Sequence, residues 1–197
     1  MKKLCIYLFL VIFTLQTPSQ ADDIRDFQIE GMSIGDSALD YFSKEKIEDH
    51  SKHEWFKSNK FTPVSNLSLS SFKTYELIQI SFKTNDKKLA LQTIEGIIFY
   101  DNNIKKCEEK LDEIVDELSK MFVNTKKKNK KKFKHNGDKS GKSKVIDAQF
   151  IFSSGDKVMI GCVDWSEELT KKNNWTDHLR ITVRTKDYSY FLANKAY

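Results

Sequence analysis

The chain has 197 residues, of which 31% are charged and 39% hydrophobic, and its formal net charge at pH 7 is +5. A domain of this size buries about 70% of its unfolded surface, which excludes any need for a metal or a disulfide to make it fold. The charge is uneven, because residues 126–144 hold ten lysines and one acid, Asp138.

The first 21 residues have the three parts of a secretory signal. Lys2 and Lys3 form a positive start, residues 4–15 are an apolar run, and Ser19 and Ala21 are the small residues of a cleavage site. Twelve apolar residues are too few for a spanning helix, which needs about 20. We therefore expect a signal peptide over 1–21 and a periplasmic or secreted single domain over 22–197. The periplasm is favoured because many lysines beside few arginines are typical of AT-rich bacterial genomes.

The predicted elements follow in chain order. Short helices come first, around Leu39 and Ile47. Residues 76–82 and 89–100 alternate apolar and polar side chains about a polar turn, which predicts a hairpin. Residues 104–122 repeat apolar side chains at steps of three and four, which predicts one amphipathic helix of about five turns. Residues 145–152 and 157–165 form a second hairpin, 178–185 a further strand, and a short helix closes the chain.

Together these elements predict an α+β fold in two layers. The antiparallel sheet would have about five strands, formed by two hairpins plus one strand, with one long amphipathic helix across a face. Residues 124–144 would be a lysine-rich loop that is solvated and mobile, since like charges repel one another.

Within that loop, the string KHNGDKSGKSKV at 134–145 superficially matches a phosphate-binding loop. Such a loop needs four residues between its glycines, a buried strand before it and a helix after it. Gly137 and Gly141 enclose only three residues, and neither flanking element is predicted, so we expect no nucleotide. The alternative is attraction to anionic surfaces. The candidate anion-binding residues are Lys126, Lys127, Lys128, Lys130, Lys131, Lys132 and Lys134.

Two cysteines remain once the signal is removed. Cys107 lies in the apolar stripe of the long predicted helix, and Cys162 lies on the apolar side of a predicted strand. If that helix crosses that face of the sheet, the two residues meet. An oxidising compartment then favours a disulfide over two buried thiols.

Motifs for chemistry are sparse. Asp164, Asp177 and His178 are the best candidates for a small secreted hydrolase, but no nucleophile or oxyanion feature accompanies them. His50 and His53 have a spacing that a metal site can use, without an identifiable third ligand. We therefore expect no metal and no cofactor.

The aromatic residues Trp165, Trp175, Tyr188 and Tyr190 could line a groove for a sugar or a peptide, or equally the edge of a core. The sequence favours a non-enzymatic binding or envelope-support protein, with a protein, cell-wall or lipid partner. The lysine-rich loop would contact anionic surfaces, and the hydrolase is the alternative.

The strings DFQIEGMSIGDSALDYFS, HNGDKSGKSKV, VDWS and TDHLRITVRTKDYSYFLANKAY resemble a family of uncharacterised exported proteins of streamlined marine alphaproteobacteria. The resemblance covers most of the mature chain and implies an exported single domain without an assigned activity. The stretch IEGMSIGDSALDYF is also similar to the start of small outer-membrane assembly lipoproteins, but no lipid-bearing cysteine stands at the cleavage site.

Overall fold

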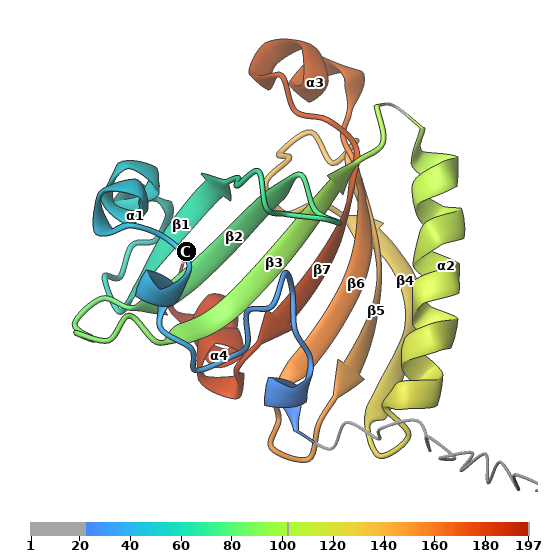
Figure 1. Cartoon of the computed structure of the whole chain (residues 1–197). Coiled ribbons are helices and arrows are strands. Elements are labelled where there is room, and N and C mark those ends of the chain that lie inside the picture. The colour runs from blue at the N-terminus through green and yellow to red at the C-terminus, as the bar shows by residue number, and fades with distance from the viewer. Residues whose placement is uncertain (1–22, 102, 197) are drawn as a thin grey trace, which may run out of the picture.

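The computed structural model describes residues 23–101 and 103–196, which form one seven-stranded antiparallel sheet (Figure 1). The predicted signal peptide lies outside the described residues. The strand order across the sheet is β1-β2-β3-β7-β6-β5-β4. The strands are β1 (Phe61–Leu67), β2 (Leu77–Lys83), β3 (Leu91–Phe99), β4 (Lys126–Lys134), β5 (Lys144–Ile151), β6 (Lys157–Asp164) and β7 (His178–Arg184). The α-helices are α1 (Lys44–His50), α2 (Ile104–Met121), α3 (Glu167–Asn173) and α4 (Lys186–Asn194), and the 3-10 turns are η1 (Ile24–Asp26), η2 (Ala38–Asp40) and η3 (His53–Trp55).

The expectation of a two-layer α+β fold with about five strands and one long helix is wrong. The chain is mostly β, with seven strands and four α-helices in the described part. The two hairpins and the strand at 178–184 are present, and two outer strands were missed. Strand β1 contains Pro63, which is tolerated because an edge strand leaves some backbone donors unused.

The other missed strand is β4, which lies in the segment 124–144 that was predicted to be a mobile loop. Its nine residues are all exposed, and it pairs with β5 at the edge of the sheet. Its side chains lack the apolar alternation by which strands are recognised. Backbone pairing with β5 therefore forms this strand, and a lysine-rich edge discourages pairing with other chains.

The core lies on the face of the sheet that α2 covers. The buried stripe of α2 (Cys107, Leu111, Val115 and Leu118) packs on β6 and β7. The N-terminal segment covers the rest of this face with Ile24, Ile29 and Met32. Leu179, Ile181 and Val183 of β7 point into the same core.

The predicted disulfide is confirmed. Cys107 of α2 and Cys162 of β6 are bonded, with their Cα atoms 6.0 Å apart, and both residues are fully buried. The pairing arises because α2 crosses the face of β6 that carries Cys162. Such a bond persists in oxidising surroundings, as outside the cell or in the periplasm.

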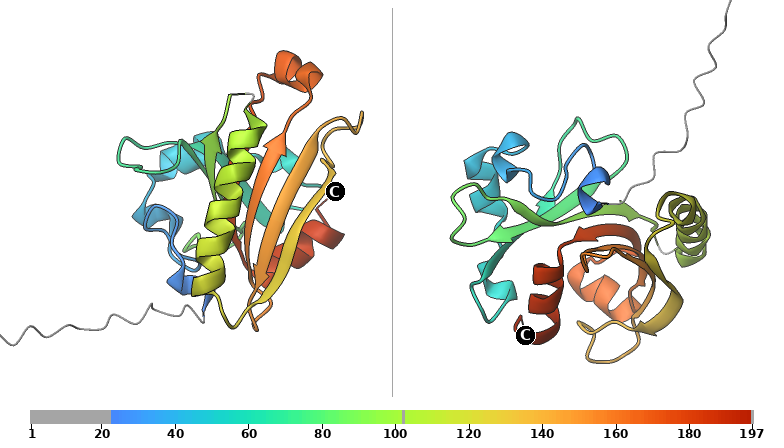
Figure 2. Two further views of the ribbon diagram at one scale, coloured as in Figure 1. Left: turned by 90° about the vertical axis from the view of Figure 1, so that its right-hand side faces the viewer. Right: turned by 90° about the horizontal axis from the view of Figure 1, so that it is seen from below.

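The opposite face of the sheet is concave (Figure 2, right). Helix α4 lies inside the curve and α2 lies outside it. Tyr188 and Phe191 of α4 pack on Phe56 and Phe61 at the β1 side, as a second small core. The rest of the concave face is open and carries the candidate site. In the described part of the chain, no helix is long and apolar enough to span a membrane.

Candidate functional site on the concave face

Strand β7 supplies the centre of the candidate site. Its odd-numbered residues are buried in the core, so its even-numbered residues face the concave side. Two of these are Arg180 and Arg184. On the neighbouring strand β6 they pair with Gly161 and Lys157. A Cβ atom at Gly161 would lie 3.2 Å from the Cβ atom of Asp147 on β5, so Asp147 occupies the space that a side chain at Gly161 would take.

These residues line a cavity of about 770 Å³, here called the cationic cavity. Arg180, Arg184 and Lys157 give its wall three positive side chains, and no carboxylate is among the described residues that line it. The lining consists of Phe133, His135, Asn136, Gly137, Val145, Gln149, Lys157, Met159, Arg180, Arg184, Ser189, Leu192 and Ala193. Cations therefore stand beside apolar side chains in one concave space.

The charges of the cationic cavity lie in partly desolvated surroundings. Burial lowers the pKa of Lys157, and the nearby charges of Lys128 and Arg184 lower it further. Arg184 lies over the ring of Tyr188, 5.7 Å from its centroid, which fixes the guanidinium against α4. Asp147 of β5 is the nearby opposite charge, because Arg180, Lys128 and Arg184 favour its ionised form against the effect of burial.

Two further groups shape the field of the cationic cavity. Asp147 of β5 is buried near it, and burial raises the pKa of this carboxyl. The hydroxyl of Ser189 on α4 is buried and has no hydrogen-bond partner among the described residues, although this residue lines the cavity.

The lysines predicted as anion-binding residues are all on β4, and the structure divides them between the two faces. Lys130 forms an ion pair with Asp112 of α2 at 2.7 Å, and Lys127 donates to Ser119 of the same helix at 2.8 Å. Lys128 and Lys131 are paired with Gln149 and Asp147 of β5, so these two lysines lie on the concave face. They extend the positive field of the cationic cavity towards solvent.

A second cavity, of about 350 Å³, lies on the same face and is here called the aromatic slot. Trp55, Trp165 and Trp175 all line it, together with Phe99 and His178. The rings of Trp165 and Trp175 lie 4.4 Å apart. Burial lowers the pKa of His178, so this ring is neutral at pH 7.

Of the four aromatic residues predicted for a groove, only the two tryptophans lie in the slot. Tyr188 is buried in the small core under α4, and Tyr190 is 57% exposed on the surface of α4. Trp55, which the sequence analysis did not consider, joins them from η3.

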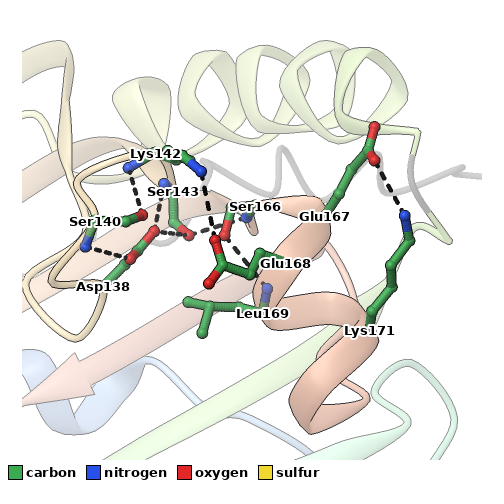
Figure 3. A network of polar contacts seen from close by, with 9 residues as sticks. All are labelled: Asp138, Ser140, Lys142, Ser143, Ser166, Glu167, Glu168, Leu169 and Lys171. Carbon is green, nitrogen blue, oxygen red and sulfur yellow. Dashed lines mark hydrogen bonds and ion pairs between the residues drawn. The ribbon is translucent and has the colours of Figure 1, made fainter.

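The loop at 135–143 is organised by a carboxylate (Figure 3). Asp138 accepts hydrogen bonds from the backbone and hydroxyl of Ser143 and from the backbone of Ser140, at 2.7–2.8 Å. The Ser143 hydroxyl in turn accepts from the backbone of Ser166, ahead of α3. These hydrogen bonds hold the pKa of Asp138 well below its usual range. Amides that a phosphate loop would offer to a ligand are thus bound to Asp138.

The three candidate hydrolase residues lie where β6 ends and β7 begins. Asp177 accepts from the backbone of Trp165 at 2.8 Å, and the Nδ1 atom of His178 faces the carbonyl of Thr176, also at 2.8 Å. Asp164 is at the end of β6, beside Lys144. His178 is on the concave face, whereas Asp164 shares the strand parity of the core residues.

The two histidines with metal-site spacing have different surroundings. The Nδ1 atom of His50 faces the carbonyl of Ser65 at 3.0 Å, whereas His53 is exposed. Among the described residues, no group of three or more metal-binding side chains comes together.

Comparison of the chain with models of protein families, with curated proteins and with solved structures found no match.

Proposed function

We propose that the protein is an exported binding protein of the bacterial periplasm that holds a small anionic ligand on the concave face of its sheet. The observation that carries this proposal is the cationic cavity of about 770 Å³. The described residues that line it include three cations and no carboxylate. Ligand sites are typically concave, mostly apolar and equipped with a few convergent polar groups. The disulfide and the predicted signal peptide support the compartment.

The use of arginine supports an anionic ligand. The chain has thirty lysines and three arginines, and two of those arginines line the cationic cavity. A guanidinium presents a planar fork of donors that matches a carboxylate or a phosphate in two parallel hydrogen bonds. An ammonium lacks this geometry. Two of the three arginines thus stand where an anion could accept two parallel hydrogen bonds from a guanidinium.

The lysines of β4 contribute a broader attraction. All nine residues of the strand are exposed, and Lys128 and Lys131 lie on the concave face. Clustered positive charge raises the local concentration of anions and weakens with salt. In this proposal the strand guides anions, or an anionic surface that delivers them, towards the cavity.

Calorimetric titration with hexyl phosphate tests the proposal. The protein should bind one equivalent, and Arg180→Gln or Arg184→Gln should weaken binding roughly tenfold or more, because a charged hydrogen bond is lost. The matched control is Arg25→Gln, which removes the third arginine at η1, outside the cavity. Equal affinity for hexanol, or the same loss of affinity in all three variants, would refute the proposal.

A further inference from the structure

The cationic cavity and the aromatic slot adjoin one another. A small cavity of about 130 Å³ lies between them and shares Arg184 and Leu192 with the cationic cavity. It shares Trp55 and Gln79 with the aromatic slot. The ring of His135, which lines the cationic cavity, also lies 4.3 Å from that of Trp165 in the slot. The three spaces form one trough along the concave face.

The two ends of the trough differ in chemistry. The slot is lined by all three tryptophans of the chain and by Leu77, Ile97 and Phe99. Its described lining has one cation, Lys52, and no carboxylate. Trp55 and Trp175 remain 43% and 39% exposed, which leaves large apolar rings in contact with water unless something covers them.

A carboxylate lines the middle of the trough. Glu95 lines the small central cavity and accepts a hydrogen bond from Thr182 at 2.6 Å. Its charge would repel an anionic group placed beside it. Arg184 lines the same small cavity, so the direction of the ligand is set by the two ends of the trough, with the cations at one end for an anionic head and the aromatic rings at the other for an uncharged tail.

The length of the trough sets the size of the ligand. On β7, His178 of the slot is two residues from Arg180 and six residues from Arg184. At about 3.3 Å per residue, these backbone separations are about 7 Å and about 20 Å. We infer that the ligand is a straight-chain anionic amphiphile, whose phosphate or carboxylate head binds Arg180 and Arg184 and whose alkyl tail lies in the aromatic slot. This inference rests on the proposed function, because it assigns the head to the same cavity.

A series of alkyl phosphates with six, eight, ten and twelve carbons tests the inference, each used below its micelle concentration. Affinity measured by calorimetry should rise about threefold to fourfold for each methylene that the trough buries. The emission of the tryptophans should shift along the series, since all three line the slot. The matching fatty acids distinguish a phosphate head from a carboxylate head.

Variants at exposed rings make the test specific. Trp55→Ala and Trp175→Ala should flatten the gain with chain length, whereas Arg180→Gln should weaken binding by a similar factor at every chain length. Two positions are used because they come from separate elements, so a folding defect in one leaves the other informative. The matched control is Tyr190→Ala, which removes a 57% exposed ring on α4 outside the slot and should leave the series unchanged.

The outcomes separate this inference from the proposed function. Arginine-dependent binding of hexyl phosphate without any gain for longer chains, and without a change in tryptophan emission, would overturn the inference and leave the proposed function standing. Absence of anion binding at every chain length would overturn both. A neutral sugar such as maltose that shifts the tryptophan emission and competes with decyl phosphate would also overturn the inference.

Discussion

At the residue scale, Asp138 explains why KHNGDKSGKSKV resembles a phosphate loop without being one. Its carboxylate takes the place of a bound anion, since it accepts from Ser140 and twice from Ser143 (Figure 3). The small residues of the string let the chain wrap closely around that carboxylate. The network also connects the loop to α3 through Ser166.

Asp138→Asn should lower the melting temperature and speed amide exchange at Ser140 and Ser143. An amide has one acceptor oxygen and no charge, so it cannot serve the three donors. Because the folded pKa of Asp138 is lowered, its stabilisation is present above the ordinary pKa of 3.8 and is lost as the pH falls below that value. Thermal melts at pH 7 check the variant against Asp49→Asn, an exposed control on α1. Equal melting temperatures for the two would contradict this role.

His135 should make stability depend on pH. Burial lowers its pKa to about 4, from an ordinary value of 6.5. Between these values the unfolded chain binds more protons than the folded one, so the free energy of unfolding falls as the pH drops from 6.5 towards 4. Denaturant titrations at pH 7 and pH 5 should show a smaller difference in His135→Phe, which keeps a ring against Trp165. The control His53→Phe changes an exposed histidine and should show the same difference in unfolding free energy between pH 7 and pH 5 as the wild type. A smaller difference in His53→Phe, with an unchanged difference in His135→Phe, would contradict the assignment to His135.

Part of the site could have been predicted at this scale. In HLRITVRT the alternation that buries Leu179, Ile181 and Val183 also places Arg180 and Arg184 together on the other face. Arginine is rare in this chain, which makes two of them on one strand face a usable signal. Lys157 could not have been added from the sequence, because its place beside Arg184 depends on the pairing of β6 with β7.

At the element scale, the sequence predicted what local periodicity encodes and missed what pairing creates. Helix α2 and strands β2, β3, β5, β6 and β7 follow clear patterns of apolar spacing. Strand β4 carries no such pattern, and its extended form depends on β5 as a neighbour. Pairing between strands leaves no apolar pattern in the local sequence of β4, so it could not be predicted from that sequence. Strand β4 was missed for that reason, and the count was wrong because β1, at the other edge of the sheet, was missed as well.

The bond between α2 and β6 should contribute strongly to stability. Cys107 and Cys162 are 55 residues apart, and closing such a loop stabilises the fold by about 4 kcal/mol in the chain-entropy model. Denaturant unfolding of the oxidised protein and of the Cys107→Ala/Cys162→Ala variant measures the difference. Thiol labelling of the denatured, unreduced protein should find neither of these two cysteines reactive. Two labelled thiols, or equal unfolding free energies, would contradict the disulfide's contribution.

At the scale of the whole molecule, the curved sheet separates two tasks. Its convex face buries the core under α2, and its concave face holds the cations and the tryptophans. The sequence indicated export and binding without locating the binding site. The site depends on the curvature of the sheet and on side chains from β6, β7, α4 and η3, which are distant in the chain.

Export itself is testable. The predicted signal implies that protein recovered from the native envelope begins at Asp22. Intact-mass measurement of the soluble envelope fraction should give the mass of residues 22–197 with two hydrogens missing, because of the disulfide. Full-length chain in the membrane fraction would overturn the prediction.

The central claim is that Arg180 and Arg184 hold the anionic head of a ligand on the concave face. The side-chain Nε–H spectrum of ¹⁵N-labelled protein tests it most directly, since the chain has only three arginines and Arg25 lies at η1, away from the cavity. Titration with decyl phosphate should shift the signals of Arg180 and Arg184 to saturation and leave that of Arg25 in place. Unchanged signals for both cavity arginines, or an equal shift of all three, would contradict the claim.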